Sequence, residues 1–120
     1  MLLNRFYVEF YKKENGNCPM REFLEALDIK KRAKVLLMIH FLEENGNELR
    51  EPYSKLLQED IFELRIKLGT DIFRVLYFFC VDKMIILTHG FIKKTKKTPR
   101  NEITRAIMYR KDYFRRNIHE

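Results

Sequence analysis

Three stretches in the second half of the chain are mainly hydrophobic, and the first of them alternates hydrophobic and polar residues with the period of a β-strand. They cover about residues 61–67, 71–80 and 84–93, and successive side chains of a strand point to opposite faces of its sheet. Turn residues separate them: Leu-Gly-Thr-Asp at 68–71 and Val-Asp-Lys at 81–83. The pattern predicts three consecutive antiparallel strands joined by two hairpins.

The first half of the chain predicts one strand and two helices. Aromatic and β-branched residues are concentrated at 5–11, as is typical of a strand. Residues 18–27 and 30–45 have the pattern of helices, and Asp28 is suited to cap the second one. Because residues 35–42 are apolar around much of that helix, we expect it to be enclosed on more than one side.

A basic helix is predicted at the C-terminal end, over about residues 100–116, with Thr98 as its cap and Pro99 in its first position. Its apolar residues at near-helical spacing are Ile103, Ala106, Ile107 and Phe114. The predicted order, β-α-α-β-β-β-α, is that of an α+β fold with a largely antiparallel sheet. No repeat or linker interrupts the sequence, which predicts a single domain over residues 1–120.

The chain carries a net charge of +7, and the excess lies entirely in its second half. Residues 1–60 hold ten Lys and Arg against eleven Asp and Glu, whereas residues 61–120 hold fourteen against six. Such asymmetry favours an anionic partner, either nucleic acid or an acidic protein surface. Basic small proteins are common, so charge alone does not identify the partner.

Two cysteines, Cys18 and Cys80, show no zinc spacing and no Cys-x-x-Cys motif, which indicates a reducing compartment. No apolar run approaches the length of about 18 residues that a membrane span needs. Asn4 and Arg5 interrupt the apolar N-terminal segment too early for a signal peptide. These features predict a cytoplasmic protein.

Two-residue hairpin loops at 69–70 and 82–83 would pair Arg65 with Arg74, and Arg74 with Phe91. The face then predicted to lie against the two helices carries Leu64, Ile66, Phe73, Val75, Tyr77, Phe79, Ile86 and Ile92. The opposite face carries the cations and polar residues Arg65, Lys67, Arg74, His89 and Lys93, together with Phe91, Ile72, Leu76, Phe78 and Leu87.

Placing Arg65 directly opposite Arg74 is unfavourable by itself, because like charges across a strand pair repel. Glu63 alone does not neutralise the cations on this face. The arrangement is explained if the face binds a polyanion, with Phe91 available for base stacking. Alternatively, these residues form a solvated outer face, from which Arg74 points away from the core.

The segments "ELRIKLGTDIFRVLYFF" (63–79) and "ILTHGFIKKTKKTP" (86–99), followed by a basic helix, resemble the RelE/ParE toxin superfamily. The similarity is greatest to its phage-derived HigB-like branch. It implies a RelE-like α+β fold, in which two N-terminal helices pack on one face of a small sheet and a basic helix ends the chain.

The resemblance also implies a function. RelE and HigB relatives are toxins of type II toxin–antitoxin systems, and they cleave mRNA on the ribosome and so inhibit translation. Attack of the 2′-hydroxyl on the adjacent phosphate needs no metal or other cofactor. The implied partners are the ribosome, mRNA and a cognate antitoxin, typically a HigA-like helix-turn-helix protein.

By position, Arg74 matches the arginine that steadies the scissile phosphate in RelE-like enzymes. Arg65 and Lys67 match two basic positions before it, and Lys93 or Lys94 matches the basic residue at the end of the last strand. The residues expected to contact RNA or the ribosome are His89, Phe91, Lys96, Lys97 and Arg100.

The proton acceptor has several candidates. A lysine among other cations loses its proton more easily and therefore suits this role, and His89 is the alternative. Tyr109 and Tyr113 are candidates for the C-terminal tyrosine of some relatives, whereas the closing Asp-Tyr-His of certain HigB proteins is absent.

Two other functions fit the same resemblance. ParE-like members poison DNA gyrase and do not cut RNA, and a non-catalytic module would bind nucleic acid or an antitoxin-like protein. The Arg65/Arg74 pair with its neighbouring lysines favours the endoribonuclease.

Overall fold

A five-stranded sheet forms the centre of the computed structural model, which describes residues 5–117. Its strands are β1 (Tyr7–Phe10), β2 (Ser54–Leu56), β3 (Phe62–Leu68), β4 (Asp71–Cys80) and β5 (Met84–Ile92). They lie in the order β1-β5-β4-β3-β2, and only β1 runs parallel to its neighbour, β5. The predicted α+β fold with a largely antiparallel sheet is therefore confirmed, although the sequence pattern did not reveal the short strand β2.

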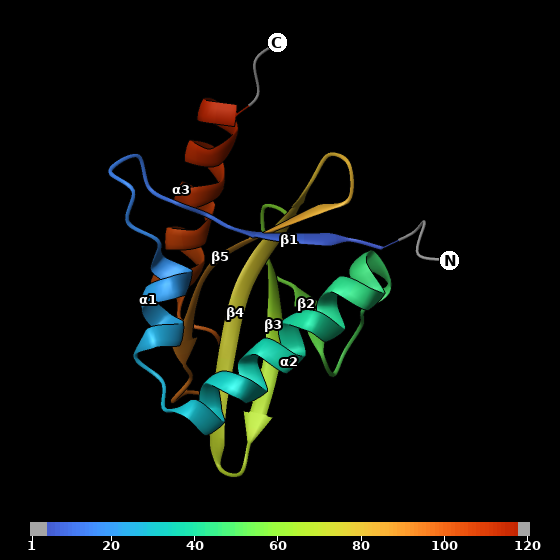
Figure 1. Cartoon of the computed structure of the whole chain (residues 1–120), viewed down its shortest axis with the longest axis vertical. Helices are drawn as coiled ribbons and strands as arrows, with labels where there is room; N and C mark the ends of the chain where they lie inside the picture. Colours follow the sequence, from blue (N-terminus) through green and yellow to red (C-terminus); the bar gives the residue numbers. More distant parts are fainter. Residues whose placement is uncertain (1–4, 118–120) are drawn as a thin grey trace.

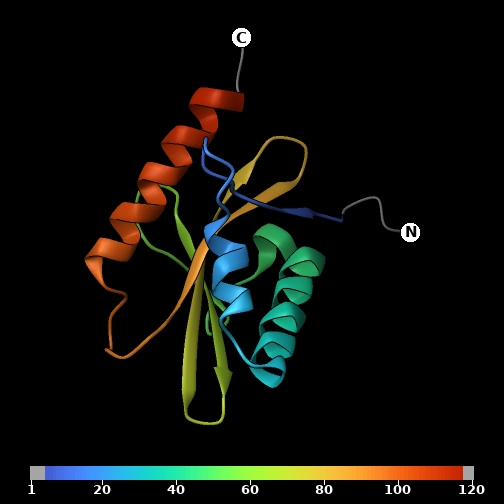
Figure 2. The same cartoon turned by 60° about the vertical axis from the view of Figure 1, so that its left-hand side comes forward.

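Helices cover both faces of the sheet (Figures 1 and 2). They are α1 (Pro19–Glu25), α2 (Ile29–Asn45), which the short 3-10 helix η1 (Gly46–Glu48) follows, and α3 (Arg100–Asn117). Asp28 caps α2 as predicted, because its side chain accepts a hydrogen bond of 2.9 Å from the Lys31 backbone N–H. Within residues 5–117, no helix is long and apolar enough to cross a membrane.

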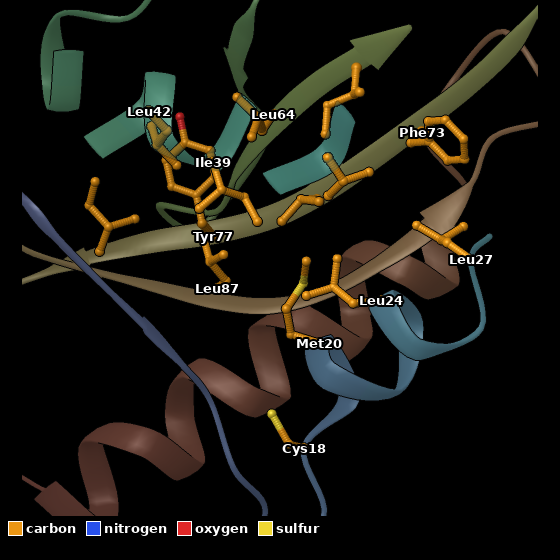
Figure 3. Packing of buried hydrophobic residues seen from close by; sticks show 14 residues of the cluster. Cys18, Met20, Leu24, Leu27, Ile39, Leu42, Leu64, Phe73, Tyr77 and Leu87 are labelled. Atoms are coloured by element: carbon orange, nitrogen blue, oxygen red, sulfur yellow. The ribbon is translucent and has the colours of Figure 1, made fainter. Parts of the chain in front are cut away.

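The main core lies between the sheet and the helices α1 and α2 (Figure 3). From α2 it receives Val35, Ile39 and Leu42, which share one cluster with strand residues that include Leu64, Phe73, Val75, Tyr77 and Leu87. The outer side of α2 is not covered, since Leu36 is 45% and Leu37 is 59% exposed. The prediction that this helix is enclosed on more than one side was wrong.

The two hairpins differ in how regular they are. The first has the predicted register, with Arg65 opposite Arg74 and Ile66 opposite Phe73. In the second, Arg74 lies opposite Phe91 as predicted, but the register shifts between Leu76 and Tyr77. Leu76 pairs with His89 and Tyr77 with Leu87, so Thr88 forms a β-bulge.

This bulge reverses the predicted faces of two residues. Beyond it, Leu87 points into the main core, whereas Ile86 packs on the opposite face. Both residues had been assigned the other way round, because a shift of one residue exchanges the two faces of a strand. Between the strand ends Cys80 and Met84, residues 81–83 form the turn, one residue more than expected.

Helix α3 covers part of the face that the cations share. Its Ala106 is fully buried, and Ile107 and Phe114 pack beside it on a second cluster that contains Leu76 and Phe78. The helix crosses β4 and β5 on the side opposite α1 and α2 (Figure 2). This face therefore holds a second small core.

His89 links β5 to α3. Its side chain is 1% exposed; Nε2 lies 2.9 Å from Oε1 of Glu102, and Nδ1 lies 3.1 Å from Oγ1 of Thr88. Arg105 adds an ion pair to Glu102 at 3.6 Å. Burial lowers the pKa of His89, and the hydrogen bond from His89 lowers the pKa of Glu102.

We predict that acid weakens the folded state through His89. Its pKa in the folded chain lies below its ordinary value of 6.5, so below pH 6.5 the unfolded chain binds a proton that the folded chain resists. Stability should fall there by up to about 1.4 kcal/mol per pH unit. His89→Gln should flatten this dependence in thermal melts between pH 7.5 and 5, whereas the exposed His40→Gln should not. If the stability of both variants depended on pH in the same way, His89 would not be the cause of the acid sensitivity.

Candidate functional site

A buried carboxylate lies between the two facing arginines. Glu63 precedes Arg65 by two residues in β3, so both side chains lie on the same face. Oε2 of Glu63 accepts a 2.9 Å hydrogen bond from Nε of Arg65, and Oε1 lies 3.5 Å from Nε of Arg74. The side chain of Glu63 is only 2% exposed. It compensates much of the repulsion that the facing arginines would otherwise suffer.

Arg74 is itself buried, with 8% of its surface exposed. Its Nη1 donates to the Phe73 carbonyl at 3.2 Å, while Nε is buried without a hydrogen-bond partner among the described residues. Burial and the charge of Arg65 lower the pKa of Arg74, and Glu63 acts in the opposite direction. Arg74 therefore does not project freely into solvent, and its removal affects the packing of Glu63.

The loop between β5 and α3 closes over the same carboxylate. Oγ1 of Thr98 donates to Oε1 of Glu63. Thr98 does not cap α3 as predicted, since the helix begins at Arg100 and the first helical bonds go to the Pro99 carbonyl. At the other end of the loop, the backbone N–H of Lys93 donates to the Ile72 carbonyl at 2.8 Å, and its Nζ donates to the Lys96 carbonyl. Glu63 thus joins this loop to β3 and β4.

These elements enclose a pocket of about 240 Å³, called here the Glu63 pocket. It is lined by Lys55, Leu57, Glu63, Arg65, Lys93, Lys96, Lys97, Thr98 and Ile103. Five of these side chains are cationic and one is a carboxylate. Burial, and then the nearby charge of Arg74, lower the pKa of Lys93. The pocket can bind an anion and offers an amine that gives up its proton more readily than an ordinary lysine.

Comparison with protein families supports the resemblance to the RelE/ParE superfamily but not the assignment to its HigB-like branch. The family described as "Phage derived protein Gp49-like (DUF891)" matches residues 22–111, from α1 to the middle of α3. The chain belongs to the Gp49-like family. This family is part of the RelE/ParE-like toxin superfamily. No curated protein matches the sequence.

Several predicted site residues of this Gp49-like chain come together and others do not. Arg65, Lys93, Lys96 and Lys97 line the Glu63 pocket, and Arg74 adjoins it through Glu63. Lys67 is exposed and lines a different pocket with Arg65 and Arg74. Lys94 and Arg100 are exposed but are not among the residues that line the Glu63 pocket; Arg100 and Lys97 share a neighbouring one.

The predicted aromatic and histidine candidates lie against α3. His89 is enclosed beneath this helix and therefore presents no surface to RNA. Phe91 is half-buried, and its ring centroid lies 5.9 Å from that of His89. Tyr109 stacks on Tyr11 with ring centroids 4.7 Å apart, and Tyr113 packs on Phe78. Neither tyrosine lines the Glu63 pocket.

Sequence reasoning had not assigned Glu63, Lys55 or Thr98 to the site. For Glu63 a signal was present, because a lone carboxylate on the same strand face as two arginines is a natural partner for both. Lys55 belongs to the unpredicted strand β2. Within residues 5–117, no group of three or more His, Cys, Asp or Glu side chains is arranged to hold a metal ion.

We predict that Glu63 is the stability determinant of this site. Glu63→Ala leaves Arg74 buried without a carboxylate, which should lower the free energy of unfolding by about 3–5 kcal/mol. Arg74→Ala should cost less, because Glu63 keeps Arg65 and Thr98 as partners. Lys67→Ala, at an exposed position, should stay within about 0.5 kcal/mol of the unmodified chain. Urea denaturation measures all three, and a Glu63→Ala chain as stable as Lys67→Ala would contradict the assignment.

Proposed function

We propose that the chain is the toxin of a type II toxin–antitoxin system and acts as a metal-independent endoribonuclease on ribosome-bound mRNA, thereby inhibiting translation. Its membership of the RelE/ParE-like toxin superfamily supports the toxin role. The observation that carries the catalytic part is the convergence of Arg65, Arg74 and Lys93 around one buried carboxylate.

In the proposed reaction, the 2′-hydroxyl oxygen forms a bond to the adjacent phosphorus, and the bond from phosphorus to the 5′-oxygen breaks. Lys93, in its neutral form, takes the proton of the 2′-hydroxyl, and water returns a proton to the leaving 5′-oxygen. Negative charge grows on the non-bridging oxygens, where the Arg65 and Arg74 guanidinium groups stabilise it. The products are a 2′,3′-cyclic phosphate and a 5′-hydroxyl.

Glu63 has a positioning role in this proposal. A guanidinium group that is held by a carboxylate keeps a fixed direction, and so loses little conformational freedom when a phosphate binds. Arg65 has 26% of its side chain exposed, which leaves donors for a ligand. Lys96 and Lys97 add positive charge that attracts an RNA backbone.

The proposed partners are the ribosome, mRNA and an antitoxin that occludes the cationic surface. A face with this excess of cations binds RNA non-specifically wherever RNA is abundant. A HigA-like helix-turn-helix protein is the antitoxin that the sequence resemblance implies. Co-purification of such a protein with the chain, after the two are expressed together, would support this part of the proposal, and failure to recover any co-encoded protein would contradict it.

Arg74→Lys tests the arginine fork directly. Lysine retains the charge beside Glu63 but not the bidentate geometry, so mRNA cleavage on programmed ribosomes should fall about 10²–10³-fold. Arg65→Lys should reduce cleavage to a similar extent, whereas Lys94→Ala should cleave nearly as well as the unmodified chain. Thermal melts identify any variant that fails to fold.

Wild-type cleavage by both arginine variants would refute the proposed catalytic role. Expression of the chain in living cells distinguishes the endoribonuclease from the other two functions. If the chain is an endoribonuclease, translation should stop rapidly. Toxicity with DNA-damage signalling would instead indicate a gyrase poison, and absence of toxicity a non-catalytic binding module.

The pH dependence of cleavage tests Lys93 as the base. Since Lys93 must lose its proton and its pKa lies below the ordinary 10.5, cleavage should rise with pH to a midpoint below 10.5. Lys93→Arg should remove the rise together with most of the activity, whereas Lys94→Arg should preserve both. An unchanged profile in Lys93→Arg would assign the proton transfer to another group.

A further inference from the structure

A second pocket, of about 370 Å³, lies on the other side of Arg65. It is called here the Tyr53 pocket. The strand β2 pairs with β3 only as far as Leu64, after which the backbone N–H of Arg65 bonds the Tyr53 carbonyl at 2.8 Å. The pocket opens next to α2, where β3 continues beyond its pairing with β2. Arg65 lines both pockets, so one extended ligand can pass from the first to the second.

All four charged side chains that line the Tyr53 pocket are cationic. Lys34 comes from α2, Arg65 and Lys67 from β3, and Arg74 from β4. No carboxylate lines the pocket. Charge complementarity therefore selects an anionic occupant.

The rest of the lining is apolar and includes one exposed aromatic ring. Tyr53 is 46% exposed, and its ring is supported at the edge by Phe41, with centroids 5.2 Å apart and planes at 76°. Met38, Pro52, Ile66 and Ile72 complete the apolar surface. Cations that follow a backbone, beside an aromatic ring on which a base can stack, are the features of a single-stranded nucleic-acid site.

We propose that the Tyr53 pocket binds the base of the nucleotide next to the scissile phosphate, with Lys34 and Lys67 near the flanking phosphate. This inference rests on the proposed function, because it places the cleaved phosphate in the Glu63 pocket. The carboxylates of an acidic peptide would also balance the positive charge of this pocket. RNA is favoured because Arg65 joins the pocket to the proposed phosphate site, and a polynucleotide presents a phosphate and a base at each nucleotide.

The chain contains no tryptophan, so Tyr53→Trp gives a single fluorescent reporter inside the pocket. Tyr7→Trp is the matched control, because Tyr7 is 56% exposed on β1 at the opposite edge of the sheet. Each is titrated with a 2′-O-methyl hexanucleotide, which lacks the attacking hydroxyl and is not cleaved. The same oligonucleotide with abasic positions is the ligand control.

The expected result is saturable quenching of Tyr53→Trp by the base-bearing oligonucleotide, with little quenching by the abasic one or of Tyr7→Trp. Adding Lys67→Ala should reduce the slope of log affinity against log salt by about 0.7. Equal quenching of both reporters, or by both oligonucleotides, would overturn the base site. A response to a co-encoded protein but not to the oligonucleotide would make the pocket a protein-docking site instead.

Cleavage on programmed ribosomes separates this inference from the proposed function. Tyr53→Ala should weaken substrate binding roughly 5- to 150-fold, the range for losing one base–aromatic stack, and should reduce preference for the nucleotide beside the cut. Cleavage with unchanged preference and affinity in Tyr53→Ala refutes the base site and leaves the nuclease standing. Base-dependent quenching without any cleavage supports the base site and refutes the nuclease.

Discussion

The arrangement of the site depends on one buried carboxylate in contact with two arginines from neighbouring strands. Placing Glu63 out of water is costly unless both of its oxygens are paired, and Arg65, Arg74 and Thr98 provide those partners. In return, the carboxylate allows two like charges to face each other across a strand pair. It also attaches the lysine-rich loop after β5 to the sheet. The cationic pocket is therefore a property of the folded chain alone and does not require a ligand to assemble it.

Two other features leave this site accessible. Helix α3 buries Leu76 and Phe78 of β4. Because the helix begins at Arg100, only its first turn reaches the Glu63 pocket, to whose wall it contributes Ile103. On the other edge, β2 is three residues long, so the end of β3 pairs with β4 but has no strand on its other side. Arg65 and Lys93 remain partly exposed where neither element covers the sheet, whereas the main core lies on the other face, under α1 and α2.

The sequence predicted the elements whose signals are local. The two-residue turn at 69–70 placed Arg65 opposite Arg74, because such a turn leaves a single register for β3 and β4. The short strand β2 has no such pattern, and so Lys55 was missed. The burial of His89 could not be predicted, since it depends on where α3 packs. The burial of Arg74 was missed, although Glu63 lies on the same strand face. Thr98 was assigned as a cap from its neighbours in sequence, whereas its hydroxyl contacts Glu63, a neighbour in space. Arg74 lies on the predicted face, but Glu63 and the packing around it keep it from solvent.

The bulge at Thr88 divides the β4–β5 hairpin into two parts that differ in register. Near the turn, Cys80 pairs with Met84, so the loop has three residues and not the two of a hairpin without a bulge. Near the site, Arg74 lies opposite Phe91, as it would in a hairpin without a bulge and with a two-residue loop. The extra residue of the turn is therefore absorbed at position 88 and is not transmitted to the arginine. Among related chains, insertions or deletions at residues 81–83 can be tolerated when the bulge is gained or lost with them. Turn length and bulge should covary, while the spacing from Glu63 to Arg74 stays fixed.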